Sequence, residues 1–195
     1  MPALREQDVD PDPLRQLQRW LRDAASPVDT AALATATRDG RPSVRMVLLK
    51  SADDRGLTFF TNYASRKGLE LAENPRAALL LHWATLGRQA RVEGAVERLA
   101  ADESDAYWAT RPPASRVSAA ASPQSEAVAS REALESLVAD VRRRHGDDPP
   151  RPERWGGLRL LPDAYEFWQH RDDRLHDRIA YRREAEAWVV ERLGP

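Results

Sequence analysis

Five residues near the carboxyl end, RLHDR (174–178), place two arginines and a histidine close together. If this run is an extended strand, Arg174, His176 and Arg178 share one face, because side chains alternate along a strand. Two cations on one face repel each other unless an anion lies beside them, so the run could bind an anionic ligand. The alternative is a solvated edge strand whose arginines contact water or nearby carboxylates, which is the commoner case for such a run taken alone.

A second group of anion-binding side chains surrounds a turn from strand to helix in TNYASRK (61–67). Thr61, Ser65, Arg66 and Lys67 lie at this turn. The start of a helix offers unpaired N–H groups and a partial positive charge, and Arg and Lys add charge-assisted hydrogen bonds. The turn could therefore hold a phosphate, although an ordinary capped helix with solvated basic residues fits the same pattern.

Tyr107, Arg111 and Ser115 form a third set, spaced four residues apart. Residues at this spacing lie on one face of a helix. Pro112 disfavours helix at the residue before it, so the set would line a helical face and its exit. It suggests another anion pocket, although each residue taken alone fits an ordinary surface position.

Arg45 and Lys50 lie five residues apart in SVRMVLLK (43–50). On a regular strand, an odd spacing points two side chains to opposite faces. The two cations therefore need not bind the same ligand, and two separate anion sites would account for them. A surface cation remains the alternative for each.

The elements that would position these residues are mostly strands. Helices are expected at 10–25, where Asp12 can cap and Pro13 fits the first turn, and at 65–75, 101–113 and 130–146. Strands are expected at 30–37, 43–50 and 57–62, which form a meander, and at 77–83, 88–99, 155–161, 164–169, 178–183 and 187–193. A loop rich in Ser and Ala is expected after the paired prolines 112–113. This order indicates a mainly β fold with added helices (α+β), an antiparallel barrel rather than a doubly wound sheet.

Length and composition indicate one domain, at 12–195, after a flexible N-terminal segment at 1–11. The charge is balanced, with 30 basic and 31 acidic residues, which argues against binding to nucleic acid or to a membrane surface. The chain has no cysteine, which excludes disulfides and thiolate chemistry and fits a cytoplasmic protein. The first residues are too polar for a signal peptide, and no apolar run has membrane-spanning length.

Several common site motifs are missing from the sequence. There is no G-x-G-x-x-G, no P-loop and no G-x-S-x-G elbow. The four histidines, at 82, 145, 170 and 176, show no ligand spacing, so we expect no metal site.

Seven motifs, in this order, resemble the pyridoxamine 5′-phosphate oxidase family: RMVLLK, FTNYASRKG, GRQARVEG, SPQS, WGGLRL, EFWQ and RLHDR. The resemblance runs from about Asp12 to the end of the chain. It implies an FMN-binding split β-barrel and a homodimer with FMN at the subunit interface, in which the C-terminal region serves dimerisation and substrate binding. It also implies oxidation of pyridoxine 5′-phosphate or pyridoxamine 5′-phosphate to pyridoxal 5′-phosphate with oxygen as acceptor, the final step of vitamin B6 cofactor synthesis.

The same resemblance implies roles for individual residues. FMN contacts would come from Arg45, Lys50, Thr61, Arg66, Lys67, Gln89, Gln124, Ser125, Trp168 and Arg178. Substrate contacts would come from Lys50, Tyr107, Arg111, Ser115, Arg174 and His176, the last two being the catalytic pair over the pyridine ring. In RLHDR, Arg178 would then face the flavin while Arg174 and His176 face the substrate.

Three departures from the family pattern bear on the substrate more than on the fold. Phe60 stands where family members often have tyrosine, SAAASPQS lacks the expected tryptophan, and HWATLG replaces a proline-tryptophan start. Two alternatives remain: a flavin oxidase of the same fold acting on another substrate, as in phenazine assembly, and a non-catalytic protein that binds FMN or pyridoxal phosphate. Lys50 and the intact RLHDR favour the vitamin B6 function over the first alternative.

Overall fold

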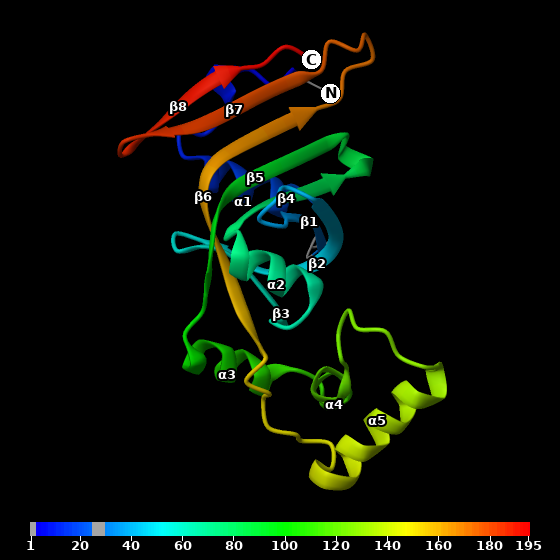
Figure 1. Ribbon diagram of the computed structural model, residues 1–195. Helices are drawn as coiled ribbons and strands as arrows, with labels where there is room; N and C mark the ends of the chain where they lie inside the picture. The colour runs from blue at the N-terminus through cyan, green and yellow to red at the C-terminus, as the bar shows by residue number, and fades with distance from the viewer. Residues whose placement is uncertain (1–2, 25–29) are drawn as a thin grey trace.

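The protein, described here by a computed structural model at residues 3–24 and 30–195, is built on one antiparallel sheet. The strands are β1 (Thr30–Ala36), β2 (Pro42–Asp53), β3 (Gly56–Asn62), β4 (Arg76–Trp83), β5 (Arg88–Arg98), β6 (Trp155–Gln169), β7 (Asp177–Glu184) and β8 (Ala187–Arg192). The helices are α1 (Pro13–Asp23), α2 (Arg66–Glu73), α3 (Ala101–Thr110), α4 (Pro113–Ala121) and α5 (Arg131–His145), with short 3₁₀ turns at Glu6–Asp8 and Ala84–Leu86. The strand order is β3-β2-β1-β4-β5-β6-β7-β8, and a further pairing of β3 with β6 closes the first six into a barrel (Figure 1). This arrangement confirms the predicted antiparallel barrel with added helices.

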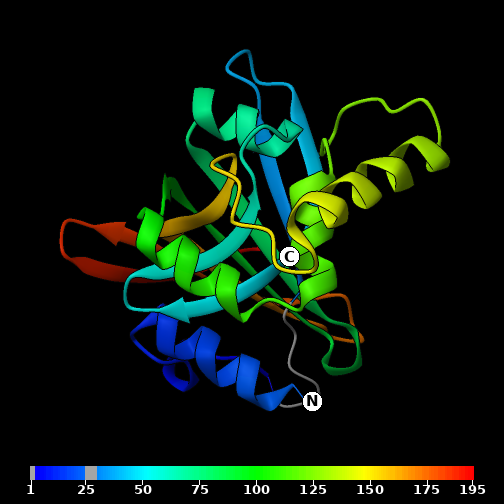
Figure 2. The same cartoon turned by 90° about the horizontal axis from the view of Figure 1, so that it is seen from below.

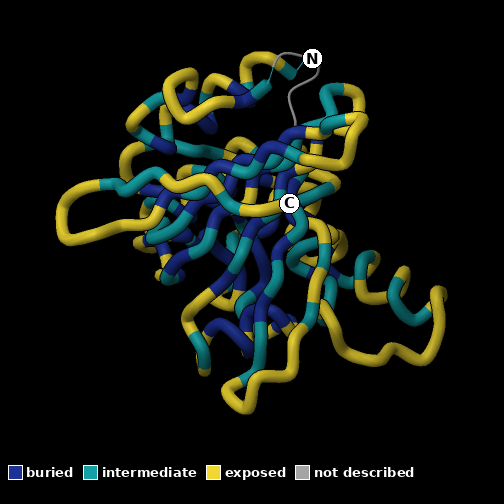
Figure 3. Tube along the Cα trace, turned by 90° about the horizontal axis from the view of Figure 1, so that it is seen from above, coloured by how far each residue is buried: buried dark blue, intermediate teal, exposed yellow. Residues whose placement is uncertain are grey.

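The core lies inside the barrel. Leu33, Phe59, Leu79, Val92 and Leu160, one from each of five barrel strands, are all fully buried. Side chains alternate between buried and partly exposed along β1, as expected for a strand with one face inward. Figure 3 shows the buried residues concentrated along the barrel strands, with exposed residues at the turns and along the outer helices.

Strand β6 corrects one sequence prediction. The sequence suggested two strands, 155–161 and 164–169, but the structure has one continuous strand, Trp155–Gln169. Pro162 lies at a register shift opposite Gly94, so the proline occupies an irregularity without ending the strand. The close approach requires glycine at position 94, because a Cβ there would lie 1.9 Å from the Leu161 carbonyl oxygen. The first part of β6 pairs with β3 and the last part with β7, while β5 pairs along both, so this strand links the barrel to the C-terminal strands.

The region after α3 corrects a second prediction. The expected Ser- and Ala-rich loop contains α4, which starts at Pro113, where proline suits a first helical turn. Val117 of α4 packs against Val141 of α5, and α5 extends away from the barrel (Figures 1 and 2). Helix α3 ends at Thr110, as Pro112 predicted. No helix in the described ranges is long and apolar enough to cross a bilayer.

Helix α1 begins as its sequence predicted. Asp12 caps it by accepting a hydrogen bond from the Leu14 N–H at 2.9 Å, and Trp20 packs edge-on against Phe167 in the core. Ahead of α1, the Leu4 N–H donates to the Asp177 carboxylate at 3.0 Å. The predicted flexibility of residues 1–11 stays a prediction. Met1 and Pro2, and Ala25 at the end of the predicted helix, lie outside the described residues.

Candidate functional site

A cavity of about 600 Å³ is lined by β2, β3 and the helices α2, α3 and α4. Its volume falls in the range of small-molecule sites. Its wall includes several of the residues that the sequence indicated for cofactor or substrate binding: Lys50, Thr61, Lys67, Tyr107, Arg111, Ser115 and Gln124. Apolar side chains of Met46, Leu48, Phe60 and Trp155 complete much of the lining. The fold thus gathers polar groups from distant parts of the chain around one partly apolar cavity.

The first turn of α2 forms one wall of this cavity. Lys67 is only 8% exposed, and its Nζ donates to Thr61 Oγ1 (3.1 Å), Ser65 Oγ (3.2 Å) and Gln124 Oε1 (3.2 Å). All three acceptors are neutral. Ser65 occupies the predicted N-cap position, but its hydroxyl donates to the Asn62 carbonyl at 2.6 Å, so within the described part of the chain no side chain caps the first N–H groups of α2. A buried ammonium therefore lies beside an uncapped helix start.

Electrostatics at this wall favour an anion. Burial lowers the pKa of Lys67 to about 8, the positive charge of Arg45 adds to the shift, and Glu70 opposes it. A nearby anion would favour the charged ammonium. The helix start contributes N–H groups and the positive end of its dipole. These properties suit a phosphate group.

Gly68 allows this wall to form. A Cβ at this position would lie 2.2 Å from the Tyr63 carbonyl oxygen and within 2.7 Å of two further backbone atoms of Tyr63. Only glycine lets the first turn of α2 pack this closely on the preceding turn.

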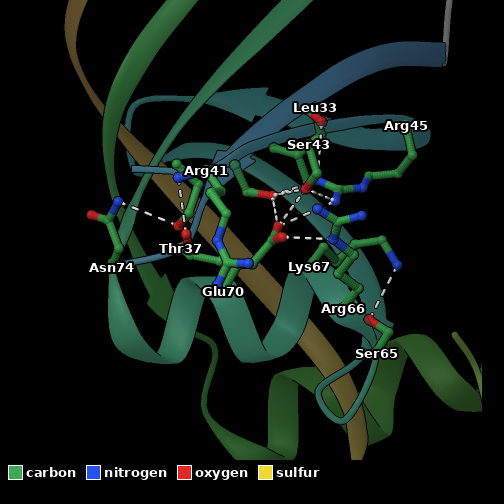
Figure 4. A network of polar contacts seen from close by, with 12 residues as sticks. Leu33, Thr37, Arg41, Ser43, Arg45, Ser65, Arg66, Lys67, Glu70 and Asn74 are labelled. Atoms are coloured by element: carbon green, nitrogen blue, oxygen red, sulfur yellow. Dashed lines mark hydrogen bonds and ion pairs between the residues drawn. The ribbon is translucent and has the colours of Figure 1, made fainter. Parts of the chain in front are cut away.

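Arg45 and Arg66, both predicted cofactor contacts, meet at the buried carboxylate of Glu70 (Figure 4). Arg66 Nε donates to Glu70 Oε1 at 2.8 Å, and Arg45 Nη2 lies 3.3 Å from Oε2. Burial alone would raise the pKa of Glu70, but hydrogen bonds from Ser43, Thr35 and the two arginines lower it to about 2. Arg45 shares a side of β2 with the buried Val47 and Leu49, whereas Lys50 is exposed and lines the cavity, which agrees with the predicted opposite faces.

A second cationic group of the cavity surrounds Arg111, at the break between α3 and α4. Its guanidinium lies 4.4 Å from the ring centroid of Trp155 and 5.2 Å from that of Trp108. Burial lowers the pKa of Arg111, and its Nη1 is buried with no hydrogen-bond partner among the described residues. Tyr107 stacks on Phe60 at 3.8 Å between centroids, so the aromatic wall that holds Arg111 is closely packed. An unpaired buried guanidinium donor is costly unless a ligand binds it.

Like Arg45 and Arg66, the remaining predicted residues do not line this cavity. Gln89 and Trp168 line a smaller cavity of about 180 Å³ on β5 and β6. Arg178, on β7, donates to the buried Glu166 at 2.7 Å, and this ion pair raises the pKa of the arginine. The His176 ring lies 4.7 Å from Trp168. These four predicted residues therefore form a second group near the C-terminal strands.

Arg174 corrects the interpretation of RLHDR as one strand. Strand β7 begins only at Asp177, and Arg174 has a φ of 66° in an exposed turn. Asp173 accepts a hydrogen bond from the Leu175 N–H at 3.0 Å, and this local turn competes with extension of the strand. Arg174 and His176 therefore do not share a strand face with Arg178. Ser125, another predicted contact, is also exposed on a turn, with a φ of 75°.

Two glutamates central to the geometry were missed from the sequence. Glu70 follows Arg66 by four residues on α2, a spacing that predicts an ion pair on a helix. Glu166 lies inside EFWQ but carried no assigned role. Among the described residues, no group of His, Asp or Glu is arranged to hold a metal ion.

Comparison with known proteins gives consistent results. Residues 18–145 match the model of the pyridoxamine 5′-phosphate oxidase family, and residues 155–195 match that of the pyridoxine 5′-phosphate oxidase C-terminal dimerisation region. The pyridoxine/pyridoxamine 5′-phosphate oxidase of Cupriavidus taiwanensis is 58% identical over 198 residues, covering 99% of this chain and 93% of that protein.

Two solved structures are similar across the whole chain. PhzG from Burkholderia lata 383, in complex with tetrahydrophenazine-1-carboxylic acid, has a TM-score of 0.92 and 38% identity, covering 100% of this chain and 99% of the other. A pyridoxamine 5′-phosphate oxidase-related, FMN binding protein from Nostoc punctiforme has a TM-score of 0.73 and 20% identity with full coverage of both chains, which supports the fold alone. Sequence, fold and family models agree, and the chain belongs to the pyridoxamine 5′-phosphate oxidase family.

Proposed function

We propose that this protein is an FMN-dependent oxidase that converts pyridoxine 5′-phosphate or pyridoxamine 5′-phosphate to pyridoxal 5′-phosphate with oxygen as acceptor. The observation that carries the proposal is one cavity with two separate cationic groups, Lys67 at the start of α2 and Arg111 between α3 and α4. The reaction requires two phosphate-bearing molecules in contact, cofactor and substrate. Two anion sites on one cavity meet that requirement.

The residues at α2 fit the phosphate of FMN. Arg45 and Arg66 both pair with the carboxylate of Glu70, and Lys67, whose ammonium contacts neutral acceptors only, adds a third positive charge at the start of the same helix. A phosphate monoester carries about −1.5 to −2 charges at neutral pH, which would balance the cationic excess. FMN would supply the redox chemistry, and the residues of this chain would bind and orient it.

The residues around Arg111 fit the phosphate of the substrate. The buried Nη1 of Arg111 lacks a partner among the described residues, and Lys50, Tyr107 and Ser115 line the same cavity. Holding the substrate by this end would fix its ring relative to the flavin, and such positioning supplies a large part of catalysis when a cofactor performs the chemical step. Arg174 and His176 would contact the ring as the catalytic pair.

A homodimer would complete the site. Four predicted residues do not line the main cavity of their own chain: Gln89, Trp168, His176 and Arg178. In a homodimer, the second copy would place its own four residues beside the main cavity of the first. Two observations support this arrangement: the match of residues 155–195 to a dimerisation region, and an exposed apolar stripe on β2 formed by Val44, Met46 and Leu48, which are 68%, 62% and 49% exposed. Met46 and Leu48 also line the cavity, so a partner covering this stripe would border the site. A cytoplasmic location remains part of the proposal.

The test is aerobic incubation of the FMN-reconstituted protein with pyridoxine 5′-phosphate and, in parallel, pyridoxamine 5′-phosphate, following pyridoxal 5′-phosphate. Product from either substrate supports the proposal. Bound FMN without product from either would refute it and favour a non-catalytic binding protein or an oxidase of another substrate.

A second candidate is oxidation of a reduced phenazine precursor. The 38% identity and TM-score of 0.92 to PhzG favour it, since that protein was solved with a tetrahydrophenazine carboxylic acid. The same assay with this tricyclic acid distinguishes the candidates. Turnover of it without turnover of the vitamin B6 phosphates would replace our proposal.

A further inference from the structure

Glu70 is a buried carboxylate with a full set of hydrogen bonds. It is 4% exposed and lies on α2, facing the β1–β2 hairpin (Figure 4). Its Oε2 accepts from Thr35 Oγ1 and Ser43 Oγ, both at 2.5 Å, and from Arg45 Nη2 at 3.3 Å, while Oε1 accepts from Arg66 Nε at 2.8 Å. A carboxylate offers about four lone-pair sites, so these donors fix its orientation.

The two arginines on Glu70 come from different elements and are used differently. Arg45, on β2, directs Nη1 to the Leu33 carbonyl and to Thr35, and Nη2 to Ser43 and Glu70. Arg66, on α2, uses Nε for Glu70, and its two Nη groups make no hydrogen bond within the described residues. Glu70 therefore orients the planar guanidinium of Arg66 through Nε, and the two Nη groups remain available to bind a ligand.

Repulsion between neighbouring positive charges explains why Glu70 is needed to hold the arginines in place. Arg45, Arg66 and Lys67 converge beside an uncapped helix start, and mutual repulsion would drive flexible side chains apart. The negative charge of Glu70 offsets one of the three positive charges, and the remaining positive charge would attract a phosphate. Because Arg66 loses side-chain freedom to Glu70 before any ligand binds, less entropy is lost on binding.

We propose that Glu70 is a positioning residue for the cofactor phosphate: it orients Arg66, whose Nη groups are left to bind the phosphate, and it holds Arg45, whose Nη groups are already bonded to the protein, beside that site as a source of positive charge. This inference rests on the proposed binding of FMN. Glu70 acts through the arginines and does not touch the phosphate itself.

Two other roles for Glu70 give different outcomes. A purely structural tie between α2 and the hairpin would affect flavins with and without phosphate equally when removed. A carboxylate that only competes with the phosphate for the arginines would, when neutralised, leave FMN bound more tightly.

The experiment compares Glu70→Gln with wild type by titrating the flavin-free protein with FMN and with riboflavin, which lacks the phosphate, and following flavin fluorescence. We expect the Kd for FMN to rise about tenfold, at the lower end of the 10- to 100-fold effects of outer-shell partners at metal sites. The Kd for riboflavin should stay within about twofold of wild type. Glu73→Gln is the matched control, since Glu73 is exposed on the same helix, and it should change neither Kd.

Three results would overturn the inference: unchanged FMN affinity, tighter FMN binding, or equal weakening for FMN and riboflavin. If Glu70→Gln does not fold, Ser43→Ala removes one donor to Glu70 at a half-buried position and should weaken FMN selectively by a smaller factor. Arg66→Ala should also make the effect of Glu70→Gln smaller than in the wild-type background, because coupled residues are not additive. Absence of FMN binding by the wild type is a separate outcome that would refute the proposed function itself, and the inference with it.

Discussion

Replacing Lys67 with methionine should stabilise the flavin-free protein while weakening FMN binding. Methionine keeps the length of the side chain and removes the ammonium that burial disfavours. The groups that bind Lys67 keep other partners, because Thr61 donates to Gln124 at 3.3 Å and Ser65 donates to Asn62 at 2.6 Å. The substitution therefore leaves few unpaired polar atoms.

The magnitude follows from the pKa of Lys67, which falls from 10.5 to about 8 in the folded protein. A shift of this size corresponds to at most about 3 kcal/mol of unfavourable free energy for the charged form at pH 7. Solvent screening and the hydrogen bonds lost with the ammonium reduce it, so we expect a gain of about 1–2 kcal/mol in unfolding free energy. For a chain of this size, each kcal/mol raises the Tm by about 2–4 °C.

The sign of the pH dependence provides the sharper test. Between pH 8 and 10.5 the unfolded chain binds more protons at Lys67 than the folded chain does, so wild-type stability should rise with pH across this window. The methionine variant lacks this rise, so its advantage should be complete below pH 8 and should shrink towards pH 10.5.

The assay is thermal unfolding of flavin-free wild type, Lys67→Met and Lys50→Met from pH 7 to 10.5. Lys50 is exposed, so its replacement should give no comparable gain and serves as the control. Parallel pH profiles for wild type and Lys67→Met, or a less stable variant at pH 7, would refute the reasoning.

Three further substitutions test other parts of the structure. Arg111→Met should raise the KM for pyridoxamine 5′-phosphate by roughly 10- to 100-fold, the effect of one charge-assisted contact, with FMN affinity retained; an unchanged KM in steady-state kinetics would contradict the assignment. Gly68→Ala should destabilise the fold by about 1–3 kcal/mol, because its Cβ would meet Tyr63 backbone at 2.2 Å, whereas Gly194→Ala meets nothing within 4 Å; equal unfolding midpoints would contradict this. Combined Arg174→Ala and His176→Ala should abolish oxidation while the flavin absorbance remains, and loss of FMN would mean that their role was misassigned.

Local patterns explain which parts of the fold the sequence predicts. The meander of β1, β2 and β3 follows from alternating apolar residues between turn signals, and the start of α1 follows from Asp12 and Pro13. The continuity of β6 does not follow, because Pro162 normally ends a strand and only the register shift opposite Gly94 on β5 accommodates it. That shift depends on a neighbour distant in sequence.

In the candidate site, too, local sequence patterns predict some features, whereas features that depend on residues distant in sequence were not predicted. Lys67 and Arg111 were predicted from their own motifs, and both line the main cavity. The hypothesis that RLHDR forms one strand is wrong at Arg174, because two-residue alternation cannot reveal that Asp173 accepts a hydrogen bond from the Leu175 N–H and forms a turn. The pairing of Arg45 with Glu70 joins β2 to α2, and no local spacing encodes it.

The predicted cofactor arginines Arg45, Arg66 and Arg178 share one feature: each is paired with a buried glutamate. Glu70 anchors Arg45 and Arg66, and in the second group Glu166, also buried, lies 2.7 Å from Arg178 and 2.8 Å from Arg91. A long arginine side chain loses much rotational entropy when a ligand fixes it, and a buried glutamate removes that freedom at folding instead. Each glutamate contacts two arginines, but Arg91 is also paired with Glu93 at 2.7 Å, so an excess of positive charge remains in the group around Glu70 and not in the group around Glu166. The proposed anion site at Glu70 therefore rests on a local imbalance between one buried carboxylate and the cations around it, which the formal net charge of −1 for the whole chain does not reveal.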